Sequence, residues 1–342
     1  MRLAFCLTAA CLLVAPACAA ADPVADFYRG KQLNVIIRAA PGGNYDQYLR
    51  LLSRHFVRHV PGNPTAVPMN MPGGGGLTAL NYVENVAPHD GTVITMVTQT
   101  TPMDQALGLD RNLKVDMRKL GWIGNVSDEN MFLVTNAGSP TKSLDDAKTR
   151  ETALSATGAG GTEVILVQVL NNVLGTRFKN ILGYRSGPEM NLAMQRGETE
   201  GRVTTNLRAL FATTNRSDYN IPLQIGMKKD KENPKVPLLR ELGTNPDDTL
   251  ALDFISRVMS LARPVATNSD VPPERVAALR RAFEETMKDP EFLAESKMQD
   301  LDVSPWTGDE LERVVSDVLT TPASIKDRIR QAIQTAPGEE KK

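Results

Sequence analysis

The sequence predicts an α/β protein with two mostly parallel sheets flanked by helices. Apolar strands alternate with amphipathic helices along most of the chain, an order typical of sheets that are covered by helices. Each half contains the same unit of strand, glycine-rich loop and helix, first at 33–60 and again at 154–175. With 342 residues the chain is long enough for two domains.

Residues 1–21 have the pattern of a cleaved signal peptide. Arg2 precedes an apolar segment at 3–14, and small residues at 17–21 offer cleavage sites. The apolar segment is too short for a bilayer, which takes about 20 residues. We therefore expect the mature chain to be exported.

Cysteine and charge exclude several classes of function. The three cysteines, at positions 6, 11 and 18, all lie in the expected signal peptide, so the mature chain has no disulfide, thiolate nucleophile or cysteine zinc site. Loss of Arg2 leaves 38 basic against 40 acidic residues, a net charge of −2. A charge so close to zero does not predict binding to nucleic acid or to an anionic membrane.

The first half begins with an apolar strand at 33–37 and a Pro-Gly-Gly turn at 41–43. A helix is expected over 44–60, because its apolar residues fall on one helical face, and Asn44 with Gln47 forms a possible capping box. The other elements expected in this half are strands at 66–71, 92–98 and 122–124 and a helix at 77–86.

The second half is expected to start near residue 128. Its predicted strands are at 131–134, 154–157, 178–182, 201–204 and 223–225, with helices at 164–174 and 188–197. A strand at 256–262 would return to the first lobe, followed by helices that begin after Asp270, Thr307 and Pro322. The predicted domain limits are 22–128 with 254–336 for lobe 1, 129–253 for lobe 2, and a disordered tail at 337–342.

The glycine loops are the candidate binding elements. A strand that leads through glycines into a helix leaves backbone N–H groups pointing at one place, which suits an anion. Loops that begin at Arg38, Thr98, Thr157 and Leu182 would lie beyond the carboxyl ends of strands, where open α/β sheets bind ligands. The loops lack the P-loop and dinucleotide signatures, so the sequence does not predict a nucleotide or any other cofactor.

Arginine side chains near these loops offer a fork of donors for a carboxylate. Arg38 and Arg185 flank the glycine loops, whereas Arg202 and Arg208 are further away in the sequence. Each arginine taken singly can equally be a surface ion-pair partner.

Catalytic and metal-binding patterns are weak. His55 and His59 are four residues apart on one helix, but no glutamate of a zinc-protease motif lies between them, and a solvated helix face is the better interpretation. The chain has no Gly-x-Ser-x-Gly motif, and Asp46, Glu163 and Glu189 lie near helix starts, where the helix dipole explains a carboxylate. We therefore predict no catalytic residue and no metal ligand.

Short motifs follow one another along the mature chain in a specific order. They are Pro-Gly-Gly-Asn-Tyr-Asp at 41–46, Pro-Gly-Asn-Pro at 61–64, a glycine-rich segment at 70–76, Pro-His-Asp-Gly-Thr at 88–92, a glycine loop at 158–162, Gly-Tyr-Arg-Ser-Gly-Pro at 183–188, and a segment at 196–201. With these motifs the chain resembles the Bug family, the periplasmic substrate-binding proteins of tripartite tricarboxylate transporters. Glu200 stands where that family often has aspartate, and Arg38 stands at a usually neutral position.

The resemblance implies a two-lobed, type II periplasmic-binding-protein-like fold, with a hinge and a central cleft that closes on a small organic acid. It also implies a periplasmic location, a monomer, and transient contact with integral-membrane transporter subunits. It places ligand-binding residues at Gly43, Asn44, Tyr45, Asp46, Thr98, Gln99, Gly160, Gly161, Thr162, Tyr184 and Arg185. The loops themselves add Arg38, Gly75, Thr157 and Asn206 to this predicted set.

Two other functions stay open at the level of the sequence. An exported enzyme that acts on a small anionic substrate would need an acid–base pair in one pocket. An orphan receptor that feeds a sensor protein would share the fold and the binding site. The sequence does not identify the ligand, since side chains such as Tyr45, Gln99 and Tyr184 would set its specificity from unknown directions.

Overall fold

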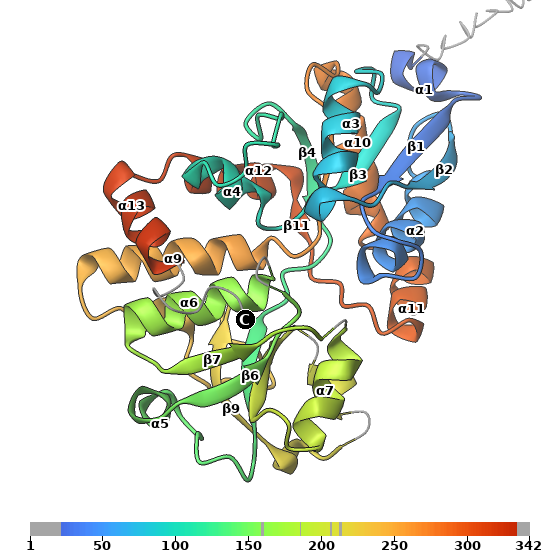
Figure 1. The fold of residues 1–342 in the computed structure, drawn as a ribbon. Coiled ribbons are helices and arrows are strands. Elements are labelled where there is room, and N and C mark those ends of the chain that lie inside the picture. Colours follow the sequence, from blue (N-terminus) through green and yellow to red (C-terminus); the bar gives the residue numbers. More distant parts are fainter. Residues whose placement is uncertain (1–21, 159–160, 185, 206, 212–213, 334–342) are drawn as a thin grey trace, which may run out of the picture.

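The computed structural model describes residues 22–158, 161–184, 186–205, 207–211 and 214–333 (Figure 1). They form two β-sheets, each flanked by helices (Figure 1). The expected signal peptide and C-terminal tail lie outside the described residues. Among those residues, no helix is both long and apolar enough to cross a membrane.

The first sheet has six strands in the order β11-β4-β10-β3-β1-β2. Its strands are β1 (Gln32–Ile37), β2 (Thr65–Asn70), β3 (Val93–Met96), β4 (Gly121–Asn125), β10 (Pro264–Thr267) and β11 (Trp306–Thr307). The helices that contact its strands are α2 (Asn44–Phe56), α3 (Leu77–Asn85), α10 (Pro273–Thr286) and α12 (Gly308–Leu319). We call the sheet with these helices, together with α1 (Pro23–Tyr28) and α11 (Pro290–Met298), the first lobe.

The second sheet has five strands in the order β7-β6-β8-β5-β9. Its strands are β5 (Met131–Asn136), β6 (Thr152–Ser155), β7 (Phe178–Ile181), β8 (Gly201–Thr204) and β9 (Tyr219–Ile225). The helices on this side are α5 (Leu144–Thr149), α6 (Thr162–Leu174), α7 (Gly187–Gln195), α8 (Leu207–Phe211) and α9 (Pro246–Ser260). We call this sheet with these helices the second lobe.

The sheets are mixed, whereas the sequence predicted mostly parallel ones. In the first sheet β1 pairs in parallel with β2 and β3, but β10 runs antiparallel between β3 and β4. In the second sheet β6 pairs in parallel with β7 and β8, but β5 runs antiparallel to β8 and β9. β5 and β10 are the strands that the chain enters just after it crosses between the lobes, at 126–130 and 261–263. The crossings therefore account for the reversal of β5 and β10, whereas the short β11 is antiparallel to β4 without following a crossing.

The predicted strand at 256–262 is wrong, because 256–260 belong to α9 and 261–262 to the crossing that follows it. Asn245 caps the helix with its side chain and Pro246 begins it, and Leu252, Ile255 and Val258 are buried at helical spacing. A short apolar run does not by itself distinguish a strand from a buried helix. The strand that returns to the first sheet is β10.

The capping box predicted at Asn44 is also wrong, because the N-cap of α2 is Gly43 and no side chain caps it. By contrast, the expected capping box of Thr307 and Glu310 is present at the start of α12. Gly175 ends α6 in the left-handed conformation, as predicted.

The hydrophobic core of the second sheet extends into two helices that lie before and after the second lobe in the sequence. Met103 and Leu107 of α4 (Thr101–Leu107), and Ile325 and Ile329 of α13 (Ala323–Ala332), pack in one cluster with Leu133 of β5. In Figure 1, α13 lies beside α9, and the two helices are in contact. Segments assigned to lobe 1 from the sequence thus pack against the second sheet, and the exact domain limits stay a prediction.

Candidate functional site

Three loops meet at the carboxyl edge of the first sheet. β1, β2 and β3 run parallel, so the loops that follow them lie together. The Arg38 Nη2 atom donates to the Gly75 carbonyl at 2.7 Å, and the Thr98 hydroxyl donates to the same oxygen at 2.8 Å. The structure therefore brings together three of the residues predicted for the site.

Arg38 lies between the second glycine loop and the start of α2. Its guanidinium carbon is 4.1 Å from the centre of the Tyr45 ring, a cation–π contact. Gly76 has φ +105°, and a Cβ atom there would lie 2.2 Å from Arg38 Nε. Only glycine fits this position, so the loop is shaped to admit the arginine.

The start of α2 leaves backbone donors free for a ligand. Its N-cap residue, Gly43, supplies no side-chain oxygen. Among the described residues, the N–H groups of Asn44 and Tyr45 have no acceptor within hydrogen-bond distance. A 13-residue helix with an uncapped N-terminus is suited to an anion.

Asp46 holds the first glycine loop together. Its Oδ2 accepts from the Gly42 N–H at 2.8 Å, while its Oδ1 accepts from Arg50 Nε and Asn70 Nδ2, each at 2.7 Å. The side chain is buried, and burial works to raise the pKa of this carboxyl. The hydrogen bonds from Asn70, Gly42 and Arg50 outweigh burial and hold the pKa below its usual range.

Two further predicted residues point toward the second lobe or the crossings. Gln99 is buried, and its Nε2 lies 3.7 Å from the sulfur of Met259 on α9. The Asn44 side-chain oxygen accepts from Arg263 Nη2 at 2.8 Å.

Arg263 is a buried cation that the sequence analysis missed. It lies on the crossing at 261–263 and is 3.6 Å from the Glu129 carboxylate on the other crossing. Its guanidinium carbon is 5.2 Å from the ring centre of Tyr45 and 4.6 Å from that of Tyr48. The Tyr48 hydroxyl in turn donates to Glu129 at 2.7 Å. Arg263 therefore connects both crossings to the first glycine loop.

The start of α6 repeats the geometry of α2 in the second lobe. Gly161 is the N-cap, again without a side-chain cap, and its N–H donates to the Gly158 carbonyl at 2.8 Å. Within the described part of the chain, the N–H groups of Thr162 and Glu163 have no acceptor. The Thr157 N–H donates to Glu163 Oε1 at 2.8 Å, and the Thr157 hydroxyl donates to the same oxygen.

Arg202 is a second buried cation, and the sequence analysis placed it too far away. It lies on β8 and donates from Nη1 to the Gly187 carbonyl at 2.6 Å and to Asn191 Oδ1 at 2.8 Å. Burial lowers the pKa of Arg202 to about 10, partly offset by the Glu163 carboxylate. A sequence signal was present, since position 202 lies just before the carboxyl end of a predicted strand.

The remaining predicted residues of the second lobe are only partly described. Gly160, Arg185 and Asn206 lie outside the described residues, as does the side chain of Arg208. Tyr184 is half-buried and borders an open hollow of about 670 Å³ beside α7. Burial and the carboxylates of Glu198 and Glu189 raise the pKa of its hydroxyl.

The predicted site residues thus form two groups, one at the carboxyl edge of each sheet. Over the described ranges, no hydrogen bond or ion pair joins the loops at 38–46, 75 and 98 to those at 157–162 and 184. Each group has an uncapped helix start and a buried arginine near it.

A family model for the tripartite tricarboxylate transporter family receptor, TctC, matches residues 57–330. The chain belongs to this receptor family. The sequence-based assignment to the Bug-type receptors of tripartite tricarboxylate transporters is thereby confirmed.

Individual relatives of this TctC-family receptor are distant. Protein BugT of Bordetella pertussis is 24% identical over 240 residues, which cover 68% of this chain and 72% of BugT. A ligand-free TctC solute-binding protein from Polaromonas has a TM-score of 0.69 at 18% identity, over 89% of this chain and 99% of that one. MatC from Rhodopseudomonas palustris, solved with bound malate, has a TM-score of 0.61 at 16% identity. The match covers 89% of this chain and 99% of MatC. These structures confirm the predicted two-lobed α/β fold.

The receptor also has a cavity of about 490 Å³ beside the crossing at 126–130. Among the described residues, its lining comes from 128–130, Phe132, Thr205, Leu207, 228–233 and 302–304, and it carries lysines as well as carboxylates. None of the predicted site residues that the structure describes lies on it. Its lining residue Glu129 lies 3.6 Å from Arg263, which donates to Asn44 at the start of α2, so the cavity adjoins the first of the two helix starts.

The interpretation of His55 as part of a solvated helix face is wrong. His55 is buried, and its Nε2 lies 2.8 Å from a Glu295 oxygen. With Asp289 and Glu291, it forms a group whose ligand atoms are close enough to hold a metal ion. The sequence missed this group because α11 lies more than 230 residues beyond α2.

Proposed function

We propose that this receptor captures a small organic acid between its two lobes and delivers it to a tripartite tricarboxylate-type membrane transporter from the periplasm. The carboxylate would lie between the starts of α2 and α6. Arg38, Arg202 and Arg263 would supply positive charge around it, and closure of the lobes would exclude water. The protein would act without changing its ligand chemically.

The observation that carries the proposal is the matching pair of helix starts. α2 and α6 are both 13 residues long, both have a glycine N-cap, and neither has a side-chain cap. Elsewhere Ser143, Asn245 and Thr307 cap their helices with side-chain oxygens. α10 and α13 also start without a side-chain cap, but α2 and α6 start at the carboxyl edges of the two sheets, where α/β proteins bind ligands.

The expected interaction energy is sufficient for capture. Two helix starts contribute about 0.3–1 kcal/mol each, and each hydrogen bond to a charged group contributes about 1.5–3 kcal/mol. Four such bonds with two helix starts give about 7–14 kcal/mol before the costs of ordering and desolvation. A micromolar complex needs about 8 kcal/mol.

The relatives agree with a carboxylate ligand. MatC, which has the same fold, was solved with malate, a dicarboxylate. The TctC family consists of receptors of tripartite tricarboxylate transporters. An enzyme is a weaker proposal, because Asp46 is occupied by the loop and Glu200 pairs with Arg150 at 2.7 Å.

Thermal-shift screening of the mature chain tests the proposal. The panel contains mono-, di- and tricarboxylates, aromatic acids and acidic amino acids, with the matching amides as uncharged controls. We expect at least one acid to raise Tm and its amide not to do so. Native mass spectrometry of freshly purified protein then identifies any retained ligand. If no anionic ligand raises Tm and none is retained, the proposal fails.

A matched pair of glycine variants tests the place of binding. In Gly161→Ala the new Cβ would lie 2.6 Å from Glu163 Oε1 and 2.8 Å from Thr157 Oγ1, at the proposed anion site. In Gly138→Ala the new Cβ meets nothing within 4 Å. We expect only Gly161→Ala to weaken binding of the acid found in the screen, measured by calorimetry. If the two variants bind the acid with equal affinity, the acid does not bind at the start of α6.

A further inference from the structure

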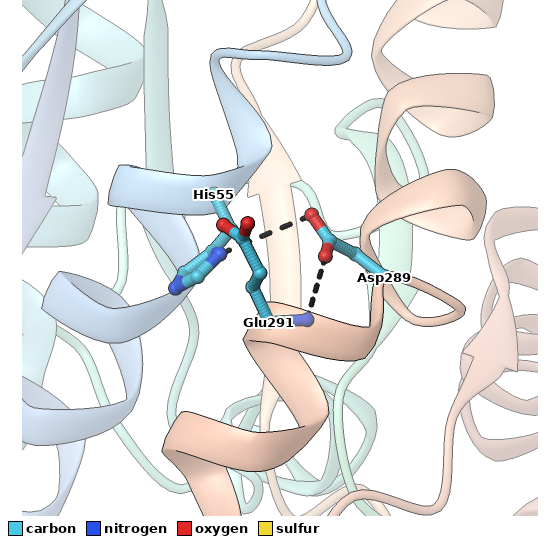
Figure 2. Close-up of side chains that lie close together, drawn as sticks. All are labelled: His55, Asp289 and Glu291. Atoms are coloured by element: carbon cyan, nitrogen blue, oxygen red, sulfur yellow. Dashed lines mark hydrogen bonds and ion pairs between the residues drawn. The ribbon is translucent and has the colours of Figure 1, made fainter.

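A compact group of histidines and carboxylates lies where α2 and α11 pack together, away from the glycine loops. His55 is in the last turn of α2 and His59 follows it, while Asp289 is the N-cap of α11 and Glu291 is in its first turn. Figure 2 shows His55, Asp289 and Glu291 turned toward one another from the two helices. We call these three residues with His59 the α2–α11 cluster.

The spacing of the ligand atoms suits a small transition-metal ion. The Asp289 Oδ2 atom is 3.2 Å from His59 Nε2 and 3.9 Å from His55 Nδ1. The ligand atoms of His55, Asp289 and Glu291 all lie within 4.8 Å of one another. Zinc bonds of about 2.0–2.1 Å at tetrahedral angles place ligand atoms about 3.3 Å apart. Small side-chain movements are therefore enough to close His55, Asp289 and Glu291 around an ion, and His59 lies beside Asp289 as the fourth ligand.

His55 already has the orientation that metal binding requires. Its Nε2 lies 2.8 Å from Glu295 Oε2, so this nitrogen carries the hydrogen and Nδ1 keeps its lone pair toward the cluster. A carboxylate that holds the far nitrogen of a ligating histidine is the usual support in zinc sites. The ring is buried and packs edge-on against Phe292, with 5.7 Å between ring centres.

A cationic side chain now occupies the centre of the cluster. Arg58 Nη2 lies 2.5 Å from His55 Nδ1 and 2.7 Å from Asp289 Oδ2, and its Nη1 lies 2.5 Å from Glu291. The lone pair of His55 thus accepts from a positive group. The Arg58 side chain is 44% exposed, so it can swing into solvent without disturbing the core.

We propose that a divalent transition-metal ion, with zinc as the probe, replaces the Arg58 guanidinium and is bound by His55, His59, Asp289 and Glu291. Two imidazoles and two carboxylates select zinc over calcium and magnesium, which prefer all-oxygen sites. The bound ion would cross-link the end of α2 to the start of α11. Arg58 would act as an internal competitor that sets the affinity.

Calorimetry with zinc chloride on the EDTA-treated mature chain tests this proposal. We expect one ion per chain for the wild type and tighter binding in Arg58→Gln, because the competitor is removed. His59→Gln should weaken binding about tenfold or more. His59 is preferred to His55 for this test, since it is partly exposed and its loss leaves the packing on Phe292 intact. Glu285→Gln, a carboxylate variant outside the cluster, should bind zinc like the wild type.

Two controls distinguish the cluster from adventitious binding. Calcium and magnesium should not bind in the concentration range where zinc does. NMR spectra should show the ring signals of His55 and His59 shifting on zinc addition, while those of His89, which lies elsewhere, stay unchanged. The proposal is overturned if neither the wild type nor Arg58→Gln binds zinc with defined stoichiometry. It is also overturned if His59→Gln binds zinc as tightly as the wild type.

Discussion

The starts of α2 and α6 have the same backbone arrangement, but the first-turn carboxylate of each helix makes different hydrogen bonds. Each has a glycine N-cap, and each sends a carboxylate from its first turn back to the preceding loop. Asp46 is buried and accepts from Gly42, Arg50 and Asn70, so three separate parts of the first lobe meet at one carboxylate. Among the described residues, Glu163 accepts from Thr157 alone, the residue just before its own loop, at an exposed site.

This difference indicates that the two lobes contribute differently to ligand binding. The first loop is preformed, because a charge network fixes it before a ligand arrives. At the second helix start the described contacts of the first-turn carboxylate are local, so we expect this side to adjust more readily to the shape of the ligand. The first lobe would then hold the carboxylate, and the second would adapt during closure.

The largest effect is expected from Asp46→Ala. It removes the carboxylate that Arg50 and Asn70 share, although these two side chains still bond each other. We expect the free energy of unfolding to fall by about 2–3 kcal/mol, because three hydrogen bonds to one buried carboxylate are lost, whereas the partly exposed Arg50 can be solvated by water. The matched variant Glu163→Ala should cost about 1 kcal/mol or less. Urea unfolding measures both, and equal losses would contradict the proposed difference between the two carboxylates.

The two buried arginines provide the next comparison. Arg263 lies 3.6 Å from Glu129, whereas the bonds of Arg202 to Gly187 and Asn191 are to uncharged acceptors. We expect Arg202→Met to weaken acid binding by about 1.5–3 kcal/mol, the energy of a hydrogen bond to a charged group, and to lower stability less than Arg263→Met does, because the acceptors it leaves behind are uncharged.

Arg263→Met is the contrasting variant. It should lower stability, because Glu129 loses its neighbouring cation at the crossing between the lobes. Calorimetry with the acid from the screen and urea unfolding separate the two outcomes. A stability loss in Arg202→Met that matches that of Arg263→Met would assign both residues to the scaffold.

Local sequence signals predicted most of the fold. The glycine loops, the capping box at Thr307 and the C-cap at Gly175 are each determined by neighbouring residues, and each is where it was expected. The error at α9 arose because a short apolar run fits both a strand and a buried helix. The reversal of β5 and β10 depends on how the chain crosses between lobes, which no local pattern encodes.

The candidate site was predictable only in part, for a similar reason. Parallel strands place their following loops at one edge, so the meeting of Arg38, Gly75 and Thr98 could be inferred from topology. The directions of Arg202 and Arg263 depend on tertiary packing. The burial of His55 depends on a helix from the far end of the chain. Each of these contacts joins residues that the sequence keeps apart or assigns to different elements.

A smaller effect, dependent on pH, is expected at Asp104 in α4, next to the Thr98 loop. Burial, with a contribution from Asp110, raises the pKa of its carboxyl to about 6. The folded state therefore favours the protonated acid. This stabilisation is complete below the ordinary pKa of about 3.9 and is lost as the pH rises through 6.

Replacement of this carboxyl by an amide should reveal the cost. Asp104→Asn should be more stable than the wild type by about 1–2 kcal/mol at pH 8, and the difference should shrink toward pH 4. Thermal unfolding across this pH range is the measurement. An advantage that does not change with pH would mean that ionisation of this carboxyl does not destabilise the folded state.

The smallest effect, and the finest test of the comparison, is expected from Glu163→Gln. The amide oxygen can still accept from Thr157, so the loop keeps its shape, but a negative charge close to the start of α6 disappears. In water a unit charge about 6 Å from a carboxylate costs roughly 0.7 kcal/mol, so acid binding should tighten about threefold. The gain should shrink as salt is added, because exposed charges are screened. Calorimetry at two salt concentrations measures it. A salt-independent loss of affinity would instead mean that Glu163 stabilises the second loop as strongly as Asp46 stabilises the first. The two helix starts would then be equivalent in this respect.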